Sequence, residues 1–169
     1  MEENNELKLV MWPDERLSTP CYQDKICVNP VSDEDKKFIR QMYAWLKEHA
    51  KEAVGIAAPQ FGVSKPMFCV RLSDPKTSKV VLNLQMINPM VYRIGKENFV
   101  VNGGEGCLSE PKIKSKGVTR AKVVLLRGYD LISKKHIAIK LSDYPAAIVQ
   151  HEMDHLKGIC LSTKNANRI

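Results

Sequence analysis

The sequence predicts a single α+β domain spanning residues 1–169, in which mostly antiparallel sheets pack around a central helix and an amphipathic helix lies nearer the N-terminus. Two observations support this class. Helical spacing of hydrophobic residues occurs near residues 33–50 and 142–158, and the short Val- and Ile-rich segments between them are not separated by helices. Strands joined without helical crossovers pair antiparallel. No repeat or flexible linker divides the chain, which indicates one domain.

Composition and cysteine usage indicate a soluble protein of a reducing compartment. No stretch approaches the roughly 18 apolar residues of a membrane span, and Met1–Lys8 is acidic and polar, unlike an export signal. The cysteines are odd in number and include no CxxC pair, which argues against a disulfide framework. They are Cys21, Cys27, Cys69, Cys107 and Cys160. We therefore expect a cytoplasmic protein without a membrane partner.

The chain carries a formal net charge of +7, from 26 Lys and Arg against 19 Asp and Glu. Such an excess raises association with polyanions such as ribosomal RNA. The basic residues are scattered, however, and no run forms the dense cluster of a dedicated patch. Solubility is the simpler explanation, so we expect weak ribosome association at most and no specific nucleic acid.

The first predicted helix covers residues 33–50. Ser32 is a suitable N-cap, and the acidic run Asp33–Asp35 belongs in a first turn. Hydrophobic residues then recur at a spacing of three to four, which gives the helix one apolar face. They are Phe38, Ile39, Met42, Trp45, Leu46 and Ala50.

From Pro66 to Leu141 the chain changes to short segments rich in Val and Ile, separated by Gly, Asn, Asp and Pro. This pattern predicts strands. The segments are Met67–Leu72, Lys79–Asn83, Met90–Ile94, Asn98–Val101, Val118–Arg127 and His136–Leu141. The turn Tyr129–Lys134 is expected to join the last two as a hairpin.

A second helix is predicted from Ser142, a candidate N-cap, to a stop at Gly158. His151 and His155 are four residues apart on it, so both imidazoles can reach a single ion. Glu152 can approach a metal-bound water without being a ligand, as general-base catalysis requires. This would be the central metal-binding helix. The alternative is a solvated helix face on which two histidines align by chance.

A third ligand is expected from Cys107, in a glycine-rich stretch between predicted strands. A Cys/His/His set suits zinc or ferrous iron and leaves one position open for water, which indicates catalysis. The residues after His155 include no Glu, Asp or His, so the downstream ligand of zincin proteases is missing. Cys160 is the rival third ligand, although it lies beyond the predicted helix end.

The remaining cysteines are expected to be small buried apolar residues. They are Cys21, Cys27 and Cys69.

Small residues cluster in Gly55–Pro59, and the run ends in Gln60. Gly and Ala let backbone segments approach closely, so tight packing is the ordinary explanation. In an amide hydrolase, a glutamine amide can also donate to an oxyanion. The residues alone leave both interpretations open.

These three segments together resemble the peptide deformylase family, whose motifs read GxGxAAxQ, EGCLS and QHExDH. Glu105–Ser109 and Gln150–His155 agree with the family at every defined position, in its order and close to its spacing. Pro13–Leu17 is similar to the family's N-terminal segment. Arg120 lies where the family has an arginine that pairs with the glutamate matched by Glu105. The resemblance covers essentially the whole chain.

The resemblance implies a metal-dependent hydrolase that removes the N-formyl group from the initiator formyl-methionine of nascent polypeptides and releases formate. One divalent ion is implied, with Fe²⁺ native and Zn²⁺ or Ni²⁺ able to substitute. Its ligands would be Cys107, His151 and His155. Glu152 would move the proton. The Gln60 side-chain amide and the Leu108 backbone N–H would stabilise the oxyanion.

The resemblance also implies how N-formyl-methionyl peptides bind. The peptide would lie as an added strand near Gly55 and Gly104, held by main-chain hydrogen bonds that do not depend on sequence. An apolar pocket would take the methionine side chain. Its expected lining is Val54, Tyr144, Ile148 and His151.

Two features depart from the family pattern. The first glycine of the first motif is Ala53 here, a change expected to tighten the substrate cleft without touching a catalytic group. The chain also ends eleven residues after Gly158, without the long C-terminal helix with which some bacterial members contact the ribosome. Docking by that route is therefore not expected.

Two other classes of function compete with this interpretation. A metal-dependent endopeptidase would share the two-histidine helix, but the downstream ligand is missing, and formate release measured beside internal cleavage separates the two. A basic RNA-binding module with a structural metal would need a fourth protein ligand and aromatic or basic clusters, and neither is evident.

Overall fold

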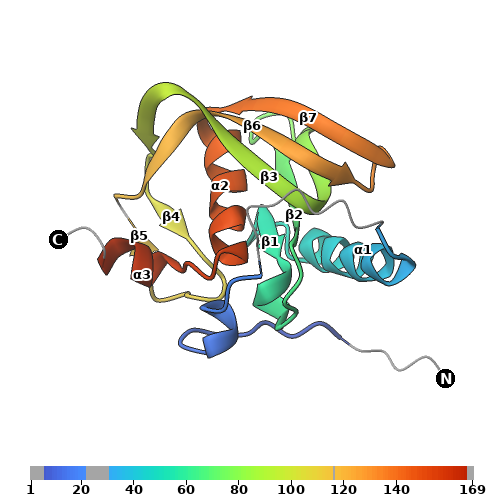
Figure 1. Cartoon of the computed structure of the whole chain (residues 1–169). Coiled ribbons are helices and arrows are strands. Elements are labelled where there is room, and N and C mark those ends of the chain that lie inside the picture. Colours follow the sequence, from blue (N-terminus) through green and yellow to red (C-terminus); the bar gives the residue numbers. More distant parts are fainter. Residues whose placement is uncertain (1–5, 22–30, 116, 167–169) are drawn as a thin grey trace.

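The computed structural model describes residues 6–21, 31–115 and 117–166, and combines helices with antiparallel sheets, as predicted (Figure 1). The helices are α1 (Asp33–Glu48), α2 (Asp143–Leu156) and α3 (Leu161–Ala166), with 3₁₀ turns η1 (Glu15–Leu17) and η2 (Ala58–Phe61). The strands are β1 (Gly55–Ala57), β2 (Met67–Ser73), β3 (Val80–Val100), β4 (Glu105–Gly106), β5 (Lys114–Ser115), β6 (Thr119–Asp130) and β7 (Lys135–Ser142). Cys27, predicted to be buried, lies outside the described residues.

The main sheet has five strands in the order β1-β2-β3-β6-β7, and each neighbouring pair is antiparallel. A separate two-stranded sheet pairs β4 with β5. The β6–β7 connection is the predicted hairpin. Because β1 is the terminal strand of the main sheet, one of its edges faces away from β2.

Strand β3 differs from the prediction, which divided it into three short strands. It runs for 21 residues, and the expected turns are irregularities in its pairing with β6 between Ile87 and Met90 and between Ile94 and Asn98. Asn88 and Gly95 take positive φ values of 52° and 73° at these points. Residues that favour turns thus produce bulges that bend the strand without ending it.

The two longer helices cover opposite faces of β2. Alternate β2 side chains point to opposite sides, so Phe68 and Val70 pack in the cluster that contains α2, whereas Cys69 packs in the cluster that contains α1. Helix α1 begins as predicted, with the Ser32 hydroxyl accepting from the Asp35 N–H, and it buries Ile39 in that second cluster. The core therefore has two parts separated by the sheet.

Helix α2 follows β7 without an intervening loop. Ser142 occupies the N-cap position as predicted, but its side chain makes no capping hydrogen bond, and Asp143 has a positive φ of 55°. The predicted stop is at Gly158, whose φ is 69°. A Cβ there would lie 2.5 Å from the Ser18 carbonyl oxygen, so only glycine fits this close approach.

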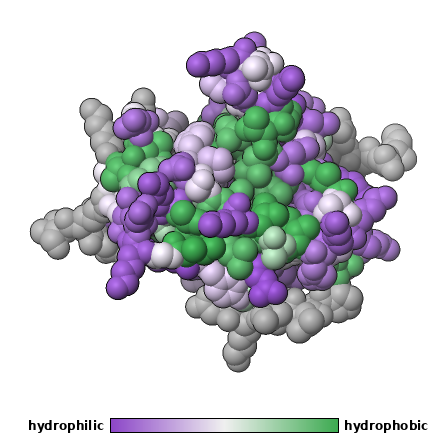
Figure 2. Space-filling view, turned by 90° about the horizontal axis from the view of Figure 1, so that it is seen from above, coloured by the Kyte–Doolittle hydropathy of each residue, from purple (hydrophilic) through white to green (hydrophobic). Residues whose placement is uncertain are grey.

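The face of β3 and β6 turned away from α2 is partly apolar. Tyr92 and Ile94 are exposed and pair across the strands with Leu125 and Val123, whereas Val124 lies in the core. From above, hydrophobic side chains gather in the middle of the molecule and hydrophilic ones surround them (Figure 2). Across the described ranges, no helix combines the length and apolar character needed to span a membrane.

Candidate active site

The three predicted metal ligands converge. Cys107 directly follows β4, and His151 and His155 lie one turn apart on α2. One ligand atom from each residue lies within 4.8 Å of the other two, and Cys107 Sγ is 3.4 Å from His155 Nε2. A thiolate and two imidazoles are donors that bind zinc and ferrous iron, so the residues present fit a divalent ion.

A buried charge pair orients one of these histidines. Glu105 Oε2 accepts a hydrogen bond from His151 Nδ1 at 3.0 Å, which leaves Nε2 for the cluster. Arg120 donates from Nε and Nη2 to the same carboxylate at 2.8 and 2.6 Å, which confirms the expected Arg120–Glu105 pair. Burial alone would raise the pKa of Glu105, but the hydrogen bonds from Arg120 and His151 lower it to about 2. The carboxylate therefore stays ionised.

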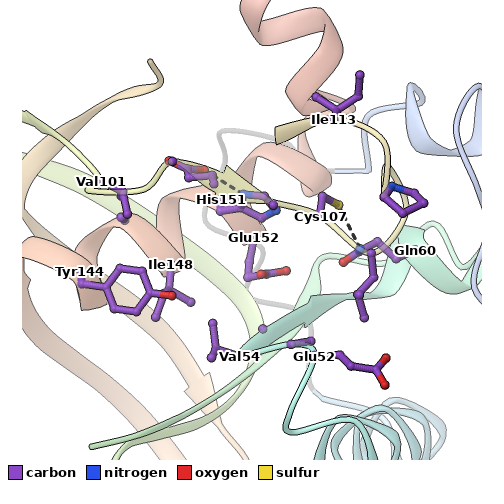
Figure 3. A pocket seen from close by; sticks show the side chains of 18 of the residues that line it. Glu52, Val54, Gln60, Val101, Cys107, Ile113, Tyr144, Ile148, His151 and Glu152 are labelled. Carbon is purple, nitrogen blue, oxygen red and sulfur yellow. Dashed lines mark hydrogen bonds and ion pairs between the residues drawn. The ribbon is translucent and has the colours of Figure 1, made fainter. Parts of the chain in front are cut away.

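Glu152 lies beside the cluster in a desolvated position (Figure 3). Its side chain is buried, and its Oε2 has no hydrogen-bond partner among the described residues. Burial raises the pKa of Glu152 to about 7, although the positive charges of His151 and Arg120 act in the opposite direction. A carboxyl group with a pKa near neutrality is suited to accept and return a proton.

The Gln60 amide is held in one orientation. Its Oε1 accepts from the Ala57 N–H at 2.9 Å, so its Nε2 is turned toward the site, where it lies 3.2 Å from Ser109 Oγ and 3.6 Å from Cys107 Sγ. The small residues before it form β1 and the start of η2, and Ala57 and Ala58 are fully buried. Tight packing of these small residues therefore orients the Gln60 amide. The packing interpretation of this segment is thus compatible with a role for the amide as a hydrogen-bond donor.

A cavity of about 490 Å³ is lined by nearly all of the predicted site residues. Its wall includes Val54, Gly55, Gln60, Gly104, Cys107, Leu108, Tyr144, Ile148, His151 and Glu152. Figure 3 shows an apolar end formed by Val54, Tyr144 and Ile148 on one side of Glu152, with Cys107 and Gln60 on the other. His155, the third member of the cluster, is buried and does not line this cavity. Ala53, which stands where the family motif has its first glycine, also lines the cavity.

Part of this cavity was not predicted from the sequence. Its wall continues through the segment after α1 and the loop between β4 and β5, which contribute Ala50, Lys51, Glu52, Pro111 and Ile113. These residues belong to no motif and lie in irregular segments. Ala50 ends the hydrophobic spacing of the first predicted helix, but no motif or spacing indicated that any of these residues lines the cavity.

Comparison with known proteins decides the family. The family described as Polypeptide deformylase matches residues 6–168. The chain belongs to the peptide deformylase family. It is therefore a hydrolase that removes the N-formyl group from nascent polypeptides, and the family is metal-dependent. The resemblance found in the sequence is confirmed.

Individual deformylases agree with this assignment. Those of Ligilactobacillus salivarius (strain UCC118) and Lacticaseibacillus casei (strain BL23) are 38% and 36% identical over 141 and 140 residues, 77% of this chain and 75% of each relative. A probable peptide deformylase from Synechococcus phage S-SSM7 has a TM-score of 0.75 at 28% identity, covering 92% of this chain and 97% of that one. A Met-Ala-Ser-bound class I type b deformylase from Acinetobacter baumannii has a TM-score of 0.75 at 27% identity, covering 94% and 97%.

The close approach of Gly55 to Glu152 predicts a selective loss of deformylase activity in Gly55→Ala. A Cβ at Gly55 would lie 2.3 Å from Glu152 Oε1, so the carboxylate must move. Misplacement of a reacting group by about 1 Å can lower the rate about 10²-fold. We expect kcat to fall on that order, while metal content and melting temperature stay near those of the parent chain.

Gly106→Ala is the control. It adds a methyl group to another glycine of the same cavity wall, where a Cβ has no heavy atom within 4 Å and displaces no side chain. Its kcat should stay close to that of the parent chain. Parent kcat in Gly55→Ala would show that the position of the Glu152 carboxylate does not matter.

Proposed function

We propose that residues 1–169 form one catalytic domain in which Cys107, His151 and His155 hold a single divalent ion, and that the enzyme works in the cytoplasm. The observation that carries this proposal is the convergence of the thiol and the two imidazoles beside the buried Glu152. We propose Fe²⁺ as the native metal, with Zn²⁺ or Ni²⁺ able to substitute. The mixed sulfur and nitrogen donors support metals of this kind.

Glu152 is assigned to the proton transfers. When bound, the ion would lower the pKa of a nearby water molecule and polarise the formyl carbonyl. Glu152 accepts a proton as the water oxygen attacks the formyl carbon. It then delivers that proton to the amine nitrogen as the carbon–nitrogen bond breaks, so the products are formate and a free methionine N-terminus. Its desolvated position beside the cluster supports this role.

Two donors are assigned to the developing oxyanion. The Gln60 Nε2 group faces the site because its Oε1 is occupied by the Ala57 N–H. The second donor is the Leu108 backbone N–H, which follows Cys107 directly and belongs to the cavity wall. Preorganised N–H groups stabilise charge where it appears without reorganising during the reaction.

The peptide is proposed to bind as an extra strand beside Gly55 and Gly104. Gly55 is in the terminal strand β1, and both glycines line the cavity. Main-chain hydrogen bonds accept many sequences, which suits an enzyme that acts on nascent chains. The apolar end formed by Val54, Tyr144 and Ile148 would hold the methionine side chain, next to His151. The Met-Ala-Ser complex of the Acinetobacter baumannii relative supports a methionine-first peptide as the ligand.

Weak ribosome association through the net charge of +7 also belongs to this proposal. A general excess of basic residues favours contact with RNA without a specific sequence. Salt should therefore weaken this association strongly.

Substrate discrimination tests the proposed chemistry. The enzyme should release formate from formyl-Met-Ala-Ser and leave acetyl-Met-Ala-Ser almost untouched, because the added methyl group crowds the attacking water. Parallel assays of formate, acetate and internal cleavage products measure this difference. Equal rates on the two peptides, or cleavage between internal residues, would overturn the proposal.

A further inference from the structure

Helix α3 contacts both of the segments that carry the metal-ligand cluster. At the N-terminal end of α3, a backbone N–H group donates to a side chain from the loop after Cys107. In the last turn of α3, a side chain donates to α2 between the two histidines. The α3 helix has six residues and follows α2 closely in the chain. A helix this short is only marginally stable in isolation. Its position therefore depends on these contacts.

The contact between the last turn of α3 and α2 begins a chain of charged groups that ends at His151. Lys164 Nζ donates to Asp154 Oδ2 at 2.5 Å, and Arg120 Nη1 donates to the same oxygen at 2.5 Å. Arg120 also holds the Glu105 carboxylate, which accepts from His151 Nδ1 at 3.0 Å. Asp154 is mostly buried, with 16% of its side chain exposed. Lys164 therefore helps to fix the Arg120 guanidinium that orients Glu105.

The contact at the N-terminal end of α3 is made by Glu110, three residues after Cys107. Its carboxylate is 2% exposed and accepts from the Leu161 and Ser162 backbone N–H groups at 2.7 and 3.1 Å, and from the Ser162 hydroxyl at 2.5 Å. The Glu110 N–H also donates to the Cys107 carbonyl oxygen at 3.0 Å. The loop that presents the thiol is therefore tied directly to the first residues of α3.

We propose that Glu110 and Lys164 are positioning residues, through which α3 braces the Cys107 loop against α2 and sets the geometry of the three ligands. This inference rests on the proposed role of Cys107, His151 and His155 in holding a metal ion. Groups that orient metal ligands typically contribute 10- to 100-fold to metal affinity or activity. Neither side chain touches the reacting atoms.

Three variants separate the brace from a general effect on folding. Glu110→Gln keeps the size of the side chain and removes its charge. Lys164→Met removes the ammonium group and keeps a similar length, and Lys164→Arg restores the positive charge. Lys140→Met is the control, because it removes one positive charge from an exposed position on β7.

The main readout is the affinity for Zn²⁺, measured by chelator competition. The second is the absorption spectrum of the Co²⁺-loaded protein, which reports thiolate ligation and coordination geometry. We expect Glu110→Gln and Lys164→Met each to lower Zn²⁺ affinity about 10- to 100-fold and to alter the Co²⁺ bands. Lys164→Arg and Lys140→Met should match the parent chain. A double variant that combines Glu110→Gln with Lys164→Met should lose less Zn²⁺ affinity than the product of the two single losses, because both side chains act through α3.

Parent affinity and a parent Co²⁺ spectrum in both Glu110→Gln and Lys164→Met would overturn the brace. An equal loss in Lys164→Arg and Lys164→Met would also overturn it, because packing of the side chain would then matter in place of its charge. If the parent protein itself shows no thiolate-to-Co²⁺ band, the proposed metal site fails before the brace is tested.

Discussion

Glu152→Gln should retain one metal ion per chain and lose at least 10²- to 10⁴-fold in kcat, the range typical of removing a general base. The substitution keeps the size of the side chain and leaves Cys107, His151 and His155 intact. An amide cannot accept the proton of the attacking water, so the chemical step slows. The proposed peptide contacts do not include this carboxylate, so KM should change far less.

Glu48→Gln provides the matched control, because Glu48 is the exposed last residue of α1. Elemental analysis of metal per chain and steady-state formate release measure both variants. Loss of the metal from Glu152→Gln, or a kcat near that of the parent chain, would show that Glu152 is not the proton-transfer group.

Cys107→Ala and His155→Ala should lose the metal ion, because each removes one of three converging donors. The expected metal content falls from one ion per chain to nearly none, and formate release falls with it. An ion present at 100 times its Kd stabilises the folded state by about 2.7 kcal/mol, so the melting temperature measured with excess metal should also fall.

Cys160→Ala tests whether these losses are specific to the proposed ligands. Cys160 is a buried cysteine whose Sγ lies 3.6 Å from the Leu17 carbonyl oxygen, and it packs with Val10 and Leu17. Its metal content should stay at one ion per chain. Metal loss in Cys160→Ala together with retention in Cys107→Ala would make Cys160 the ligand.

The elements that the sequence predicted well are those with a regular period or a local motif. Helix α1 and helix α2 start where the N-cap and hydrophobic spacing indicated. Strand β3 was divided wrongly because Asn88 and Gly95, which favour turns, are accommodated as bulges. Strands β1, β4 and β5 and helix α3 have two to six residues, which is too short for a period to be recognised.

The candidate site was predictable where a motif specifies chemistry, and less so where distant charges meet. The cluster of Cys107 with the two histidines followed from the motifs. The contact of Glu110 with Ser162 joins residues 52 positions apart, and Lys164 reaches Asp154 only because α3 folds back on α2. Such contacts depend on the tertiary fold, and neither residue type nor spacing indicates them in advance.

Anaerobic titration of the metal-stripped protein with Fe²⁺ tests the central claim most directly. Formate release from formyl-Met-Ala-Ser should be nearly absent without metal, rise in proportion to added Fe²⁺, and level off at one equivalent per chain. The same titration of Cys107→Ala should give no comparable rise. Full activity in the stripped parent protein, or an unchanged titration in Cys107→Ala, would contradict deformylation at a metal ion held by Cys107, His151 and His155.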